Sequence, residues 1–184
     1  QAVSSGWKNI NDEIWIIGSR DSGLTLGATS YLEYFHGQVT GRPPSLNLID
    51  EKLCQSFIRN GILKNLIISS HDVSDGGLAI ALAEACILSE KGASIDLVGD
   101  ERNDKLLFSE GGSRIIFSIP HIKKNEWLKF VSEESKNFTD SIYVTQIGTV
   151  SQNILKIKIL DNILCDLKIS TLADKFNNGL SNNF

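Results

Sequence analysis

Residues 71 to 77 bring together side chains that could bind a phosphate and a metal ion. The stretch reads HDVSDGGLAIALAEA, so two carboxylates, a histidine, a serine and a glycine pair precede an apolar, helix-like run. A helix N-terminus offers unpaired backbone N–H groups and a partial positive charge, and glycines let an anion approach the backbone closely. The candidate nucleotide- or phosphate-binding residues here are Ser74, Asp75, Gly76 and Gly77.

The carboxylate of Asp72 suggests that a metal ion belongs to the same site. A carboxylate beside a phosphate-sized anion is repulsive unless a cation lies between them, and Mg²⁺ is commonly held by one or two carboxylates together with phosphate oxygens. The pattern therefore predicts Asp72 as a metal ligand and a Mg²⁺-nucleotide as the ligand. The alternative is a plain helix N-cap from Ser74 or Asp75, with the glycines relieving strain. We expect His71 to be a partnered interior histidine at a strand end.

A second cluster, FSEGGSR, is built in the same way and precedes the apolar run IIFSI. Arg114 could pair with a phosphate through two N–H groups, and the glycine backbone could line the phosphate oxygens. The alternative is a bulged start of a strand with a surface ion pair between Glu110 and Arg114. We expect both clusters to converge on one ligand. The candidate residues of this cluster are Ser109, Glu110, Gly111, Gly112, Ser113 and Arg114.

Periodicity and glycine or proline breakers place the first cluster between a strand and a helix. The run EIWII predicts a buried strand, and Gly61 is expected to end a helix that follows the Pro43–Pro44 loop. The first half is expected to contain a strand over 13–17, a helix over 28–35, a loop over 37–46, a helix over about 48–60, a strand over 66–69 and a helix over 78–89. The 71–77 motif should therefore occupy a strand-to-helix corner.

The second half of the chain is richer in strands. Strands are expected over 94–98, 114–119, 141–150, 154–160 and 163–167, with a tight turn at Asp161–Asn162. Only two helices should interrupt them, over 123–134 and over 170–178, the latter capped by Ser170 or Thr171. Helices concentrated early and strands late predict an α+β fold with a mixed β-sheet and flanking helices, and they argue against a doubly wound parallel sheet.

The length of the chain limits the number of domains that it can form. A chain of 184 residues, 41% hydrophobic, can bury one sizeable core, so we expect a single domain over 1–184. Within it, 1–12 is expected to link to a preceding domain and 179–184 to fray. The chain opens with glutamine and contains no methionine, so we expect a fragment of a longer polypeptide.

Charge and cysteine content exclude several classes of partner. The net charge is −4 with scattered Lys and Arg, so the basic footprint of a nucleic-acid binder is missing. No run approaches the about 20 apolar residues of a membrane span, so we expect no membrane association. Cys54, Cys86 and Cys165 are far apart and in no metal-like spacing, which favours a reducing, cytoplasmic location.

Three stretches together carry a resemblance to a known family. HDVSDGGLAIALAEA, the LLFSEGGSR that follows it and the upstream YLEYFHGQVTGRPPSLNL resemble the C-terminal end of the phosphoribosylformylglycinamidine synthase family, and the resemblance covers nearly the whole chain. That family is similar to two tandem copies of the aminoimidazole ribonucleotide synthetase architecture, each an α/β half followed by an α+β half. The resemblance implies that this chain is the last C-terminal half, with the fold of that superfamily's C-terminal domain.

The family's reaction joins formylglycinamide ribonucleotide, ATP and glutamine-derived ammonia to give formylglycinamidine ribonucleotide, ADP and phosphate in purine biosynthesis. By the resemblance, Asp72 would be a Mg²⁺ ligand and Ser74 would touch ATP or ADP, at an auxiliary site. The catalytic histidine region and the glutaminase cysteine would lie outside these residues, so no residue here is assigned a catalytic role. The implied partners are the preceding synthetase domains of the same polypeptide, a glutaminase subunit and a small accessory subunit, and the isolated chain should be inactive.

One segment departs from the family pattern. SRDSGLTLGATSYLE stands where relatives often show a Gly-Gly-Ser variant, which leaves ligand contacts at 22–30 open. Two alternatives remain: the C-terminal domain of another superfamily member, such as an aminoimidazole ribonucleotide or selenophosphate synthetase, and a non-catalytic nucleotide-binding module. The HGxVxGRPP loop paired with SEGGSR favours the first family over its relatives.

Overall fold

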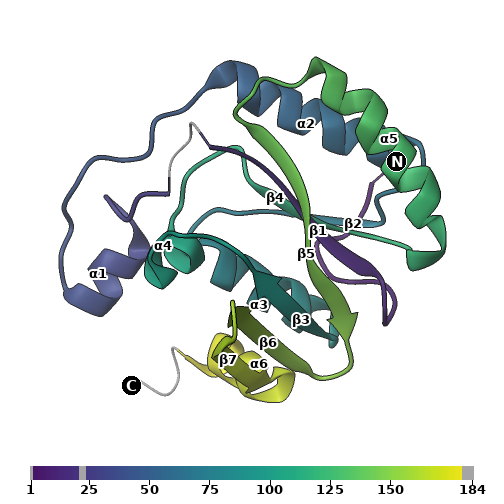
Figure 1. The fold of residues 1–184 in the computed structure, drawn as a ribbon. Helices are drawn as coiled ribbons and strands as arrows, with labels where there is room; N and C mark the ends of the chain where they lie inside the picture. The colour runs from purple at the N-terminus through teal and green to yellow at the C-terminus, as the bar shows by residue number, and fades with distance from the viewer. Residues whose placement is uncertain (1, 21–23, 180–184) are drawn as a thin grey trace.

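The computed structural model describes residues 2–20 and 24–179 and consists of one β-sheet with helices on both faces (Figure 1). The strands are β1 (Glu13–Ser19), β2 (Ser69–Asp72), β3 (Gly92–Leu97), β4 (Ile115–Ile119), β5 (Ile142–Ser151), β6 (Ile154–Ile159) and β7 (Asn162–Lys168). The helices are α1 (Ser30–His36), α2 (Leu48–Leu63), α3 (Gly77–Ser89), α4 (Asn103–Phe108), α5 (Lys124–Glu134) and α6 (Ile169–Asn178). Of the tail over 179–184 that was expected to fray, residues 180–184 lie outside the described residues.

The seven strands follow the order β2-β4-β1-β5-β3-β6-β7. The pair β3 and β6 is parallel and the other described pairs are antiparallel, so the sheet is mixed and the predicted α+β class is confirmed. None of the helices in the described ranges combines the length and the apolar character that a membrane crossing needs.

β1 runs through the centre of the sheet and is buried on both faces. Ile14 and Ile16 face the core beneath α3 and α6, whereas Trp15 and Ile17 face the core beneath α2 and α5. These helix pairs lie on opposite sides of the sheet in Figure 1. Because both faces of β1 are covered, its middle, residues 14–17, is a continuous apolar run without polar alternation.

Residues 2–12 pack against the same domain. Trp7 is 2% exposed in the core beneath α3, and its indole Nε1 donates a hydrogen bond to Cys86 Sγ at 3.3 Å. The backbone N–H of Ser70 in β2 donates to the Ser4 carbonyl at 3.0 Å. The segment before β1 therefore contributes to the core as well as leading into it.

Several predicted helix boundaries are wrong. α1 begins two residues late, with Thr29 as its N-cap, because Ala28 has the left-handed φ of 57°. Gly61 does not end α2 but lies inside it, where a Cβ would come within 2.5 Å of Ile67 Cδ1. The Ser170–Thr171 pair does not cap α6, since the N-cap position precedes it and no side chain makes the capping bond.

Strand predictions are shifted where apolar residues sit in loops. β2 begins three residues later than expected, because Leu66 and Ile67 are buried in the loop before it. The turn into β7 lies at Leu160 and Asp161, one residue early, and Leu160 has φ 54°. The short helix α4 has no counterpart among the predicted elements.

Candidate functional site

β2 ends at Asp72 and α3 begins at Gly77, so the 71–77 motif occupies the predicted strand-to-helix corner. Gly76 and Gly77 have φ of 77° and 71°, a left-handed conformation that glycine adopts without strain. A Cβ on Gly77 would also lie 2.7 Å from the Leu107 carbonyl oxygen of α4. The turn and the close approach of α4 together require the glycine pair.

The alternative of a simple helix cap at this corner is wrong. Gly76 is the N-cap residue of α3, and no side chain accepts a hydrogen bond from the first turn. Ser74 and Asp75 are both exposed, and within the described part of the chain neither side chain makes a hydrogen bond. The polar side chains of the corner therefore face solvent, beside a helix N-terminus that neither Ser74 nor Asp75 caps.

Asp72 and His71 differ sharply in their surroundings. The Asp72 side chain is 77% exposed, and its carboxylate lies 3.7 Å from His71 Nδ1. His71 Nε2 lies 3.2 Å from Glu84 Oε2 on α3, as expected of a partnered histidine. No group of three or more His, Cys, Asp or Glu in the described ranges could hold a metal ion, so Asp72 offers a single carboxylate.

Glu110 joins the two helices that border this corner. Its Oε1 accepts hydrogen bonds from the Gly76 N–H at 2.7 Å and from the Ser30 N–H, at the start of α1, at 2.9 Å. The predicted Glu110–Arg114 surface ion pair is wrong, because Arg114 is buried and turns to the other side of the segment. An internal carboxylate therefore already occupies one backbone donor that the sequence suggested for a phosphate.

The remaining polar side chains of the second cluster are bonded inside the protein. Ser109 Oγ donates to the Lys105 carbonyl at 2.6 Å, and Ser113 Oγ donates to Glu51 Oε2 at 2.7 Å. Arg114, 4% exposed, donates from Nε and Nη2 to backbone carbonyls of its own segment. The two predicted clusters thus meet through Glu110, but Arg114 does not reach the corner.

An aromatic groove of about 670 Å³ opens beside the corner. The Tyr31 ring stacks on Phe108 with ring centroids 4.6 Å apart and on Phe35 at 5.3 Å. Asp75 and Gly76 line the same groove. Sequence reasoning missed this groove, although the aromatic residues of YLEYF are spaced to share one side of a helix, because α1, α3 and α4 come together only in the fold.

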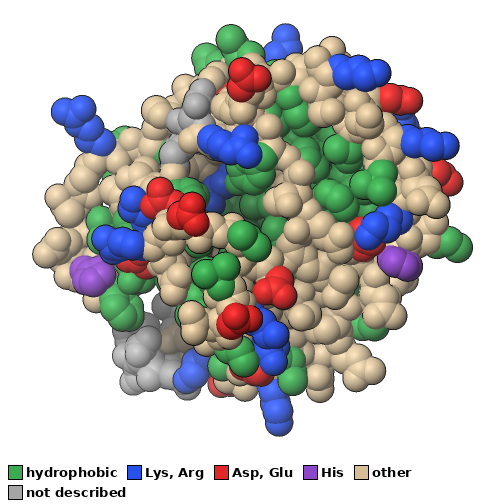
Figure 2. All heavy atoms as spheres, viewed as in Figure 1, with side chains coloured by type: hydrophobic (Ala, Val, Ile, Leu, Met, Phe, Trp, Pro, Cys, Tyr) green, Lys and Arg blue, Asp and Glu red, His purple; other side chains and the backbone are tan. Residues whose placement is uncertain are grey.

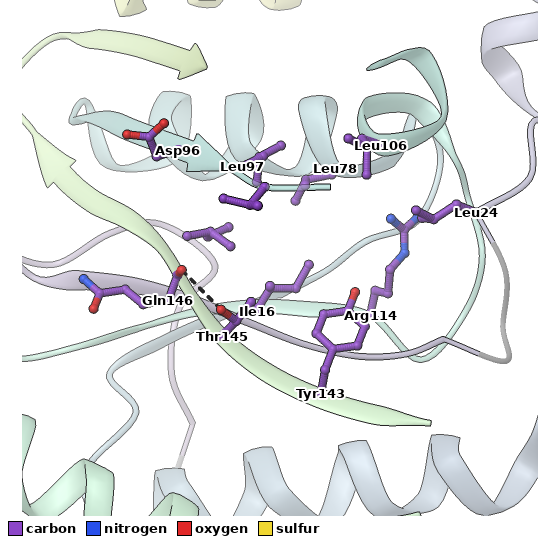
Figure 3. Close-up of a pocket in the computed structure, with 12 residues that line it drawn as sticks. Ile16, Leu24, Leu78, Asp96, Leu97, Leu106, Arg114, Tyr143, Thr145 and Gln146 are labelled. Atoms are coloured by element: carbon purple, nitrogen blue, oxygen red, sulfur yellow. Dashed lines mark hydrogen bonds between the residues drawn. The ribbon is translucent and has the colours of Figure 1, made fainter. Parts of the chain in front are cut away.

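Arg114 lines a hollow of about 150 Å³ between β5 and α4 (Figure 3) and an adjoining cavity of about 700 Å³. The Tyr143 side chain from β5 lies beside it, and the Arg20 guanidinium lies 5.4 Å from the Tyr143 ring centroid. Burial lowers the pKa of Arg114, and burial raises the pKa of Tyr143 against the opposing effect of both arginines. On the face seen in Figure 2, basic and acidic side chains are scattered around an inner area of hydrophobic ones.

Asp50 holds α2 against this edge of the sheet. It is fully buried, and its carboxylate accepts hydrogen bonds from the hydroxyls of Ser19, Thr139 and Ser141. Burial opposes ionisation, but these hydroxyl hydrogen bonds outweigh it and lower the pKa of Asp50. The end of β1, which Arg20 follows, and the start of β5, which contains Tyr143, are thereby fixed relative to α2.

Known proteins resemble the chain in sequence and in fold. The family model described as AIR synthase related protein, C-terminal domain, matches residues 9–152. The phosphoribosylformylglycinamidine synthase subunit PurL of Prochlorococcus marinus strain MIT 9301 is 59% identical over 185 residues, which cover 100% of this chain and 24% of that relative. The chain therefore spans about a quarter of the length of such relatives.

Two solved structures of Thermotoga maritima PurL share the fold. The complex with FGAR superposes with a TM-score of 0.72 at 16% identity and covers 93% of this chain and 29% of that one. The complex with ATP gives a TM-score of 0.69 at 17% identity, with coverages of 93% and 27%. At these identities the likeness establishes the architecture, including the mixed sheet.

Proposed function

The chain belongs to the AIR synthase related protein C-terminal domain family, and on this premise we propose that it is the last C-terminal domain of a phosphoribosylformylglycinamidine synthase. The observation that carries the proposal is the 59% identity to Prochlorococcus PurL over the whole chain. The complete enzyme would be an amidine-forming ligase of purine biosynthesis, converting formylglycinamide ribonucleotide, ATP and glutamine-derived ammonia to formylglycinamidine ribonucleotide, ADP and phosphate.

Within that enzyme, the β2–α3 corner would bind a Mg²⁺-nucleotide. Asp72 would contact the ion, and Ser74, Asp75, Gly76 and Gly77 would line the phosphates. The exposed Asp72 carboxylate supports this assignment, and so does the first turn of α3, since the helix start carries a partial positive charge and neither Ser74 nor Asp75 caps it. Mg²⁺ usually keeps several waters and binds through one or two carboxylates plus phosphate oxygens, so a single carboxylate fits its preference.

The aromatic groove next to the corner suits the base of such a nucleotide. Asp75 and Gly76 line both features, so a ligand with its phosphates at the α3 N-terminus would extend its base towards Tyr31 and Phe108. Aromatic rings favour offset stacking or edge contacts with other π-systems. ATP and ADP complexes of Thermotoga PurL support a nucleotide as the ligand class.

The second cluster, residues 109–114, would hold the β2–α3 corner in place. Ser109, Glu110, Gly111, Gly112 and Ser113 would fix the loop shape through Glu110's bonds to the starts of α1 and α3. The expected partners are the preceding synthetase domains, a glutaminase subunit and a small accessory subunit, and the expected location is the cytoplasm. The PurLQS structure from Thermotoga supports an assembly of this kind.

A chimeric enzyme tests this proposal. The corresponding quarter of Prochlorococcus PurL would be replaced by this chain and expressed in a bacterium that lacks its own synthase subunit. We expect growth without added purine, and no ATP-dependent ligase activity from the chain alone, because the ATP-binding half that completes the site would be missing. A soluble, folded chimera that never supports growth would argue instead for another superfamily member or a nucleotide-binding module.

A further inference from the structure

Arg114 carries a buried charge without an acidic partner. It is 4% exposed, and among the described residues no carboxylate lies within salt-bridge distance of its guanidinium. Its acceptors there are the Gly111 carbonyl, 3.3 Å from Nε, and the Ser109 carbonyl, bonded to Nη2. A buried guanidinium normally pairs with an anion, so two carbonyls leave part of its binding capacity unused.

Arg114 lines a cavity of about 700 Å³. Arg20 lines the same cavity with a second positive charge, and it is also lined by Tyr143 and by Thr145, whose Oγ1 donates to the Gln146 carbonyl at 3.5 Å. Within the described chain the Tyr143 hydroxyl makes no hydrogen bond, and Gly18 leaves room for it, since a Cβ there would lie 2.6 Å from Tyr143 Oη. Positively charged and hydroxyl-bearing side chains therefore line the same cavity.

The rest of the wall is mainly apolar. Leu24, Val98 and Leu106 line it, while the acidic Glu101 at the same cavity is paired with Lys105 at 3.1 Å. Asp96 lines only the narrower hollow of about 150 Å³ that adjoins at Arg114 and Tyr143. The cavity shares no lining residue with the aromatic groove at the corner.

We propose that this cavity binds the phosphate group of a small organic molecule, at a site separate from the β2–α3 corner. Guanidinium forks and hydroxyls suit a phosphate, which offers more acceptor positions than a carboxylate, and the apolar wall would contact the organic remainder. The volume exceeds what a bare phosphate fills, so the organic part determines how tightly the ligand fits. This inference does not depend on the proposed function.

Calorimetric titration of the 184-residue chain with phenyl phosphate, inorganic phosphate and benzoate tests the site. Phenyl phosphate should bind saturably and more tightly than either other probe. Arg20→Gln and Tyr143→Phe should each weaken it by about tenfold, the effect of losing one charge-assisted hydrogen bond. Arg59→Gln, which removes an exposed arginine on α2, and Asp72→Asn at the corner should leave the affinity unchanged.

Each contrary outcome overturns a stated part of the proposal. Absence of saturable binding, or wild-type affinity in both Arg20→Gln and Tyr143→Phe, would show that the cavity is not an anion site. Tighter binding of benzoate than of phenyl phosphate would reject phosphate as the ligand chemistry. Loss of binding in Asp72→Asn would mean that the probe occupies the corner instead.

Discussion

The segment 109–114 carries a negative charge on one side and a buried positive charge on the other, and the two charges have different partners. On one side Glu110 supplies an internal anion to backbone donors at the starts of α1 and α3. On the other side Arg114 supplies a buried cation whose acceptors are backbone carbonyls. On the first side a protein carboxylate already occupies two backbone donors, whereas the second side keeps a positive charge at the wall of a cavity.

This difference shows that similar motifs can have different uses. The two glycine-pair clusters look alike in sequence, yet one presents exposed carboxylate and hydroxyl groups at a helix N-terminus and the other is mostly bonded internally. Glu110 links them through its side chain, and the Val73 N–H links them by donating to the Arg114 carbonyl at 2.9 Å. The comparison therefore predicts that the buried Arg114 contributes most to stability, whereas the exposed Asp72 at the corner contributes to ligand binding and little to stability.

Arg114→Met should produce the largest loss of stability. The substitution removes two charge-assisted hydrogen bonds and leaves buried carbonyls without a donor, which we expect to lower the free energy of unfolding by about 3 kcal/mol. Urea unfolding measures this value, with the exposed Arg59→Met as the matched control. Equal midpoints for the two variants would show that the arginine side does not hold the segment together.

Gly77→Ala should rank next. Its φ of 71° strains any other residue, and the new Cβ would also meet backbone atoms of Leu107, Phe108 and Ser109. We expect a loss of about 2 kcal/mol or more. Gly37→Ala has a similar φ but open space around it, so it should lose only about 1 kcal/mol. Similar losses of stability in both variants would show that backbone strain alone, without the contact between Gly77 and residues 107–109, explains the Gly77 effect.

Asp50→Asn should lower stability by about 2 kcal/mol at neutral pH and flatten its acid dependence. The pKa of Asp50 is lowered on folding, so its contribution is present above the unfolded value near 4 and is lost as pH falls through the lower folded value. Thermal melts from pH 6 to pH 2 should show a smaller decline for the variant. Parallel declines would mean that the three hydroxyls do not stabilise the carboxylate.

Glu110→Gln should have a smaller effect, about 1 kcal/mol, because the amide oxygen can still accept a hydrogen bond but the negative charge at two helix starts is lost. Hydrogen exchange would locate the change at α1 and the start of α3, away from the cavity. If protection fell instead around Tyr143, the two sides of the segment would not be independent.

The sequence predicted elements whose pattern is decided locally and missed features that depend on contacts. EIWII and the 78–89 helix were predictable because their apolar residues leave one choice of structure. The predicted bounds of the polar strand β2 were shifted because it is an edge strand, paired with β4 and bridged on its other side by Ser4, so it needs no apolar run. Tyr143 and Arg20 lie far apart in the sequence, so no local spacing of residues predicts their contact.

The candidate site was predictable in part for the same reason. The corner glycines follow from local turn chemistry, so their position at a helix start could be read from the sequence. The side to which Arg114 turns depends on β5 and on the segment's own carbonyls, which are fixed only once the sheet has formed.

The central claim is that the corner, rather than the arginine side, binds the Mg²⁺-nucleotide, and nucleotide content of the purified chimera tests it most directly. Asp72 is exposed, so Asp72→Asn should leave the melting temperature without ligand nearly unchanged, while at low magnesium it should retain about one nucleotide fewer per chain than the parent. Arg20→Gln should retain the parent's amount. Unchanged nucleotide content in Asp72→Asn, or a loss in Arg20→Gln alone, would contradict the account.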